Sequence, residues 1–136
     1  MQYANGQTVR AGDLVWWNGG ACTGYVQAAA DSASECRAMG VDCPSIFIAN
    51  RHPFDASQWC GVAHAITDFV AEGIEPLTDV DRVGLSAAYV RAVEQLGDEP
   101  HSHYRVDASI QSNRQVGWIF TFMQADTEVR KIEVLG

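Results

Sequence analysis

The sequence predicts a single-domain α+β fold. We expect a bent antiparallel sheet at the N-terminus, one main helix, and a C-terminal three-stranded antiparallel meander. Three observations support this fold class: short apolar runs separated by Gly-rich turns at the start, a capped segment of helical periodicity at residues 79–96, and alternating apolar residues in the last third. The length of 136 residues fits one domain, which spans residues 1–136.

The N-terminal strands are predicted at residues 14–17 and 23–28. Turns are expected at residues 5–6, 12–13 and 18–20, because each of these segments contains the Gly, Asn or Asp that tight turns prefer. Two strands linked by such a hairpin predict a small, strongly bent sheet. We expect this sheet to form an SH3-like partial barrel.

The middle of the chain gives weaker signals. Residues 29–40 are rich in Ala, Ser and Glu and could form a short helix, although their apolar pattern is weak. Strands are expected at residues 45–49 and at residues 61–70, where apolar residues partly alternate. Residues 73–77 are predicted to be a linker.

The clearest element is the helix at residues 79–96. Thr78 is a good N-cap, and Asp81 completes a pattern similar to a capping box. Gly97 is a natural C-terminal stop. The apolar positions form one stripe, which consists of Leu85, Ala88, Tyr89, Ala92, Val93 and Leu96.

The last third of the chain alternates between apolar and polar residues over three stretches. The first stretch runs from Tyr104 to Ile110, and a turn is expected at residues 111–115. A second strand runs from Val116 to Phe122. Another turn at residues 126–127 leads to a third strand, so these strands should form an antiparallel meander.

The charge is negative and unevenly distributed. The formal net charge is −8, and residues 61–100 contain eight carboxylates and two arginines, which gives a local charge of −6. Nucleic acids and anionic membranes are polyanions, so neither is expected as a partner. No apolar run reaches the ~20 residues of a membrane-spanning helix. The first residues lack the features of a secretory signal, so we expect a cytoplasmic protein.

The segment from residue 68 to residue 81 combines carboxylates with apolar residues. An acidic rim around the apolar anchors Ile74 and Leu77 suits docking to a basic, concave surface, although a solvated helix face would carry the same charges. Trp17 is a weaker candidate anchor, because adjacent strand residues such as Trp16 and Trp17 face opposite sides. The candidate partner-binding residues are Asp68, Glu72, Glu75, Asp79, Asp81 and Trp17.

No catalytic residue, metal site or cofactor is predicted. The four cysteines have 13, 6 and 16 residues between them, which does not match the close pairs of zinc sites. His101 and His103 would share one strand face but have no nearby third ligand. Cys60 and His64 lack the surrounding sequence of a cysteine hydrolase. Phosphate-binding Gly-rich loops and hydrolase motifs are also absent from the sequence. The cysteines are Cys22, Cys36, Cys43 and Cys60.

Three segments carry a family resemblance. They are residues 5–15 with residues 24–26, residues 46–50 followed by His52-Pro53, and residues 72–78 leading into the helix. In these segments the chain resembles the small immunity proteins of bacterial polymorphic-toxin and type VI secretion effector systems. The resemblance implies a cytoplasmic inhibitor that blocks the active site of a cognate toxin, and it transfers no individual residue.

The leading hypothesis is therefore an immunity-type inhibitor, not an enzyme, that uses the acidic segment to bind a toxin with a basic surface. A nuclease is the natural candidate, because its cleft is built to hold polyanions and carboxylates can mimic phosphates. One alternative is a small-molecule or metal-binding domain that uses Cys and His. Another alternative is a structural adaptor subunit that associates through exposed strand edges.

Overall fold

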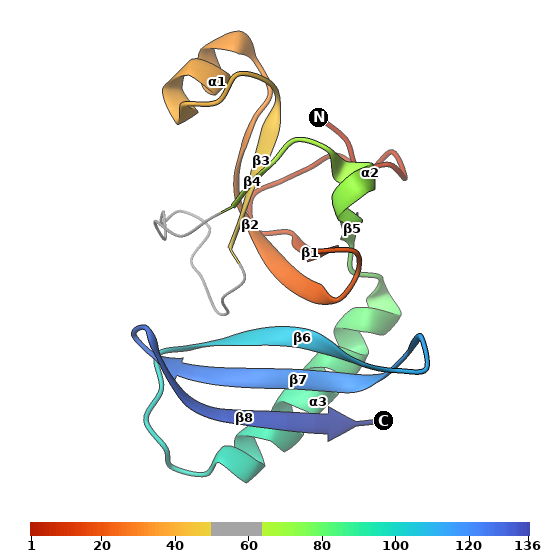
Figure 1. Ribbon diagram of the computed structural model, residues 1–136, viewed down its shortest axis with the longest axis vertical. Helices are drawn as coiled ribbons and strands as arrows, with labels where there is room; N and C mark the ends of the chain where they lie inside the picture. Colours follow the sequence, from red (N-terminus) through yellow and green to blue (C-terminus); the bar gives the residue numbers. More distant parts are fainter. Residues whose placement is uncertain (50–63) are drawn as a thin grey trace.

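The computed structural model describes residues 1–49 and 64–136 and confirms a mixed α+β fold (Figure 1). Its strands are β1 (Leu14–Trp17), β2 (Cys22–Ala30), β3 (Ser45–Ala49), β4 (His64–Ile66), β5 (Glu75–Pro76), β6 (His103–Gln111), β7 (Arg114–Gln124) and β8 (Thr127–Leu135). Its helices are α1 (Ala33–Met39), α2 (Phe69–Glu72) and α3 (Asp79–Leu96). Within the described ranges the strands form one mainly antiparallel sheet in the order β4-β3-β2-β6-β7-β8, and β1 pairs with β2 and β5.

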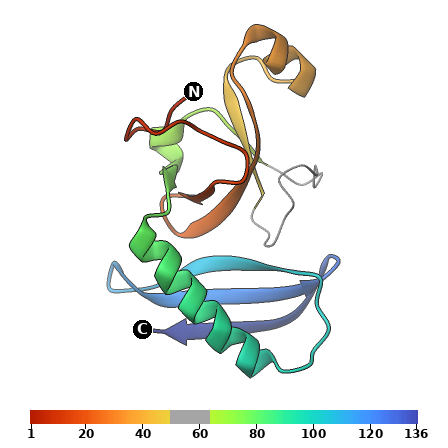
Figure 2. The ribbon, with the colours of Figure 1, turned by 180° about the vertical axis from the view of Figure 1, so that it is seen from behind.

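The elements gather in two halves. Strands β1–β5 with α1 and α2 form one half, while α3 and β6–β8 form the other (Figures 1 and 2). The sheet is continuous across the halves through one register pair, Cys22 opposite Asp107. The Thr23 hydroxyl also donates to the Val106 carbonyl oxygen at 2.6 Å. The expected N-terminal and C-terminal sheets are therefore joined into one, at a narrow point.

The N-terminal hairpin agrees with the prediction, since β1 and β2 pair antiparallel around the turn at residues 18–20. Strand β2 is bent where its register with β3 shifts between Val26 and Ala28. Extra residues at such bulges increase the local twist and bend of a strand. The bend lets one strand pair with β1 at its start and with β3 along the rest of its length.

Two predictions in the middle of the chain are wrong. The strand expected at residues 61–70 is β4 and ends at Ile66, and residues 61–63 lie outside the described ranges. Asp68 instead caps α2, because its carboxylate accepts from the Ala71 N–H at 3.0 Å, and Gly73 ends the helix with φ 63°. The linker expected at residues 73–77 contains β5, which pairs with β1.

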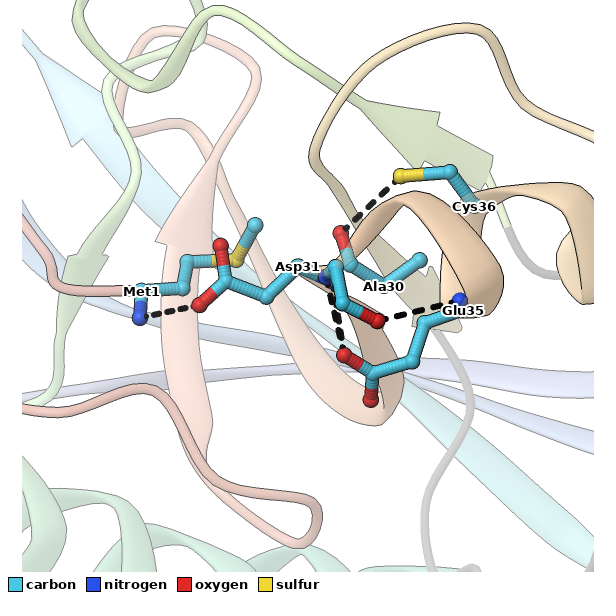
Figure 3. Close-up of polar contacts among 6 residues, drawn as sticks. Met1, Ala30, Asp31, Glu35 and Cys36 are labelled. Carbon is cyan, nitrogen blue, oxygen red and sulfur yellow. Dashed lines mark hydrogen bonds and ion pairs between the residues drawn. The ribbon is translucent and has the colours of Figure 1, made fainter.

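Helix α1 confirms the short helix considered at residues 29–40, but it occupies only Ala33–Met39. Ser32 accepts from the Glu35 N–H, and the Glu35 carboxylate accepts in return from the Ser32 N–H, which forms a capping box. The Cys36 thiol donates to the Ala30 carbonyl oxygen at 3.8 Å (Figure 3). The local signal for α1 is thus its cap, because its apolar pattern is weak.

Helix α3 follows the prediction closely. The Thr78 hydroxyl accepts from the Asp81 N–H at 3.1 Å, and Asp81 accepts in return from the Thr78 N–H at 3.0 Å. Gly97 follows the last helical residue. The helix covers one face of β6–β8 (Figure 2) and buries four side chains there. These side chains are Leu85, Ala88, Ala92 and Leu96.

No helix in the described ranges is both long and apolar enough to cross a membrane.

The C-terminal meander is also confirmed, with β6, β7 and β8 paired antiparallel. The first turn is tighter than predicted, because only Ser112 and Asn113 separate the strands, both with positive φ. This is the geometry of a two-residue hairpin. Alternate residues of these strands face α3 and are buried with it, among them Val106, Trp118, Phe120, Phe122, Ile132 and Val134.

We expect two glycines of this half to respond in opposite directions to alanine. A Cβ at Gly84 in α3 would meet only Trp118, at 3.8 Å or more, so Gly84→Ala should raise the free energy of unfolding by about 0.5–1 kcal/mol. A Cβ at Gly117 would collide with the backbone oxygen of Val134, so Gly117→Ala should lower it by about 1–3 kcal/mol. Urea denaturation measures both, and an equal effect of the two substitutions would contradict this packing.

Candidate functional site

The predicted carboxylates belong to elements that lie along one side of the molecule. Helix α2, strand β5 and the start of α3 follow one another down this side (Figure 1). The group formed by the five carboxylates is named here the acidic edge. It comprises Asp68 before α2, Glu72 at the end of α2, Glu75 in β5, and Asp79 and Asp81 in the first turn of α3.

The acidic edge forms no ion pair with the part of the chain that the structure describes, residues 1–49 and 64–136. Asp68, Glu75 and Asp79 are exposed, and Glu72 and Asp81 are partly exposed. Exposed carboxylates that form no ion pair keep their negative charge available to positively charged partners.

Asp81 differs from the other four carboxylates, because it accepts a hydrogen bond from an element distant in the sequence. Its Oδ2 accepts from the Trp16 indole Nε1–H at 3.1 Å and from the Thr78 N–H at 3.0 Å. The Trp16 ring in turn stacks on Trp118, with ring centroids 5.5 Å apart and 11° between the planes. Asp81 therefore connects the start of α3 to β1 and, through the two stacked rings, to β7.

The two apolar anchors predicted for the acidic edge are buried. Ile74 is 1% exposed and Leu77 is 3% exposed, so both belong to the core. The exposed apolar residues of the edge are instead Val70 and Val80, each 82% exposed. Sequence reasoning missed Val70 because it assigned the residue to a strand, whereas α2 turns its side chain outward from the core.

Trp17 lies on the opposite face of β1 from Trp16. It packs against the core cluster of the N-terminal half, and its ring stacks on His64 at 5.2 Å between centroids. Its indole N–H donates to the Thr23 carbonyl oxygen at 3.1 Å. The tryptophan that contacts a carboxylate of the acidic edge is therefore Trp16, whereas Trp17 is half-buried and packs against the core of the N-terminal half.

A cavity of about 330 Å³ opens beside the acidic edge, and we name it the Trp16 pocket. Two backbone segments meet at its rim, where the Gly19 N–H donates to the Glu72 carbonyl oxygen at 3.0 Å. A Cβ on Gly73 would lie 3.2 Å from the Gly19 Cα, and Gly73 has a positive φ of 63°. This contact therefore requires glycine. The residues that line the pocket are Trp16, Gly19, Gly20, Gly73, Glu75, Asp81 and Gln115.

The described cysteines are free thiols. Cys22 is half-buried beside Asn18, and burial raises the pKa of its thiol, so the nucleophilic thiolate is disfavoured at neutral pH. Cys36 is buried and Cys43 is exposed. Cys60 lies outside the described ranges, as does its proposed pairing with His64.

The histidines are placed apart from any set of metal ligands. The His101 ring meets the edge of Phe122 at 5.1 Å between centroids, and His103 shares a hydrogen bond with the Ser102 hydroxyl at 2.9 Å. Within the described parts of the chain, no three His, Cys, Asp or Glu side chains are grouped so that they could hold a metal ion. His52 lies outside those parts.

Comparisons with known proteins give no match to this chain, either among protein-family models, among curated proteins or among solved structures. What the acidic edge can bind therefore follows from its own chemistry. Carboxylates accept hydrogen bonds and attract cations, while exposed valines favour contacts that exclude water. A basic partner with some apolar surface satisfies both requirements.

We expect the two carboxylates in the first turn of α3 to contribute unequally to stability. Asp81→Ala removes the acceptor of two hydrogen bonds and should lower the free energy of unfolding by about 1–3 kcal/mol. Asp79→Ala removes a charge near the positive end of the helix dipole and should lower it by about 0.5 kcal/mol. Urea denaturation at pH 7 compares them, and equal losses would mean that Asp81 does not join β1 to α3.

Proposed function

We propose that this chain is an immunity-type inhibitor that binds a cognate bacterial toxin through the acidic edge. The toxin would act in the cytoplasm and present a basic surface, and a nuclease cleft is the natural candidate. The observation that carries this proposal is the row of carboxylates on α2, β5 and α3, which have no ion-pair partner among the described residues.

The placement of the charges supports inhibition by occupation of a basic cleft. Asp68, Glu75 and Asp79 are exposed, and they lie in or next to α2, β5 and α3, which follow one another down one side of the molecule (Figure 1). A cleft that holds nucleic acid is lined with cations, and carboxylates at similar spacing can occupy the positions of phosphates. Complementary charges also accelerate association, which favours an inhibitor that must reach its toxin quickly.

The apolar part of the contact is assigned to Val70 and Val80. Both are 82% exposed and lie between carboxylates of the acidic edge in the sequence. Interfaces commonly combine a polar rim with a desolvated apolar centre, and these valines supply the apolar surface. Trp17 is left outside this contact, because its ring stacks on His64 and its indole N–H is already bonded to Thr23.

The proposal extends to the fold that carries the acidic edge. We propose that β1, β2 and β5 form an SH3-like bent sheet, supported by the antiparallel pairing of β1 with both neighbours and by the bulge in β2. Such a sheet would hold β5, and with it Glu75, in a fixed position. A pre-ordered carboxylate loses less conformational entropy on binding than a mobile one.

Co-expression tests the proposed function. The candidate toxin is a large secreted protein encoded next to this chain's gene, and the readouts are growth of the producing cells and the Kd of the purified pair. The triple variant Asp68→Lys, Glu72→Lys, Glu75→Lys should abolish protection and raise Kd at least about 100-fold, because like charges would meet across the interface.

A matched variant controls for net charge. This control carries Glu94→Lys, Asp98→Lys and Glu128→Lys. It changes the net charge by the same amount as the acidic-edge variant, at exposed positions away from the acidic edge. It should protect cells as well as the unmodified chain does. Equal loss in both triple variants, or unchanged affinity in the acidic-edge variant, would show that the acidic edge is not the binding surface.

Salt should weaken the complex. Exposed charges are screened over ~10 Å at 0.1 M ionic strength and ~3 Å at 1 M, so the association rate should fall steeply between 0.05 M and 0.5 M NaCl. Stopped-flow fluorescence measures this rate with the same toxin. A rate that does not change with salt would contradict a charge-steered encounter.

A further inference from the structure

The Trp16 pocket has one aromatic wall whose orientation is fixed. The Trp16 ring is held from one side by stacking on Trp118, and at its edge by the hydrogen bond from Nε1 to Asp81. A ring held in this way needs no further ordering on binding, and its face away from Trp118 would offer a ligand a flat π surface. Cations are attracted to such a surface, and Trp is the most favourable of the aromatic side chains.

Two carboxylates line the pocket, and they differ in how many hydrogen bonds they already accept. Both hydrogen bonds that the Asp81 carboxylate accepts use Oδ2, and among the described residues the Glu75 carboxylate has no hydrogen bond or ion pair. Gln115 uses its Nε2 to donate to the Gly117 carbonyl oxygen, which leaves its side-chain oxygen as an acceptor for a ligand. None of the lining residues is Lys, Arg or His.

Three glycines give the pocket its depth. Gly19, Gly20 and Gly73 contribute backbone only, and the close contact of Gly73 with Gly19 keeps the rim in place. The resulting space of about 330 Å³ admits a planar group and the methylene chain behind it. A divalent metal ion does not suit the site, because within the described residues no three ligating side chains are grouped.

A guanidinium group matches all of these features. It is planar, always charged at neutral pH, stacks on aromatic rings and donates two parallel hydrogen bonds to a carboxylate. An ammonium group can attract the same carboxylates, but it lacks the flat surface and the fork of donors. The combination of a fixed indole with two carboxylates in one cavity therefore favours arginine over lysine.

We propose that the Trp16 pocket binds an arginine side chain of the partner protein, with the guanidinium stacked on Trp16 and bonded to Glu75. This inference rests on the proposed function, and it names the group through which a basic partner would be recognised. Because Asp81 is already held in place by two donors, Glu75 is the carboxylate that is free to form the bidentate contact.

The Trp16 indole N–H provides a direct readout. We would titrate ¹⁵N-labelled protein with N-acetyl-arginine methylamide and follow the indole signals of the four tryptophans, with Trp16→Phe used only to assign the Trp16 signal. N-acetyl-citrulline methylamide is the neutral probe of nearly the same shape, and the lysine derivative tests the planar fork. The arginine probe should shift the Trp16 signal in a saturable manner, at least about fivefold more tightly than either other probe.

Two variants of equal charge change test the assigned carboxylate. Glu75→Gln should weaken binding of the arginine probe at least about fivefold, whereas Glu94→Gln, on the exposed side of α3, should leave it unchanged. The backbone amide spectrum shows that both variants remain folded. Equal affinity for arginine and citrulline, or equal weakening in both variants, would overturn the arginine site.

The two proposals fail separately. If the arginine probe leaves the Trp16 signal unchanged while the acidic-edge triple variant loses protection, the arginine site is wrong and the proposed function stands. If the probe binds through Glu75 while the triple variant still protects cells, the inhibitor function is wrong, and with it the assignment of arginine to that partner.

Discussion

The hydrogen bond from the Trp16 indole to Asp81 is the interaction on which the arrangement of the two halves depends. It joins residues 65 positions apart and ties β1 to the first turn of α3. A hydrogen bond to a charged group contributes about 1.5–3 kcal/mol, and a stacked aromatic pair such as Trp16 with Trp118 adds about 0.5–1.5 kcal/mol. Since the sheet crosses between the halves through one register pair, these contacts fix how the halves meet.

Strand β1 serves both halves because its side chains alternate. Leu14 and Trp16 pack against the core of α3 and β6–β8, whereas Val15 and Trp17 belong to the core of β1–β5. The sequence shows that the two tryptophans face opposite sides, since adjacent residues of a strand do so. It does not show which one borders the acidic edge, because that depends on Asp81 and Trp118, both distant along the chain.

Features set by residues within one element could be predicted from the sequence, whereas features set by contacts between distant residues could not. Helix α3 and the meander of β6–β8 were predictable, because caps, turns and alternation are written within each element. Strand β5 was not, since two residues become a strand only by pairing with β1. The carboxylates lie in or next to consecutive elements because they follow closely in sequence, but the exposure of Val70 and the burial of Ile74 depend on contacts with the rest of the core. The Trp16 pocket depends on a contact between Gly19 and Gly73, which no local pattern indicates.

The acidic edge divides its charges between folding and recognition. Asp81 is needed by the fold, and its negative charge is stabilised by two donors and by the start of α3. Asp79 can gain from the same helix dipole, whereas Glu72 and Glu75 form no ion pair among the described residues. Under the proposed function, a basic partner would pair its cations with these two carboxylates. Because Asp81 belongs both to the junction of the halves and to the wall of the pocket, binding there would also stabilise the contact between the halves.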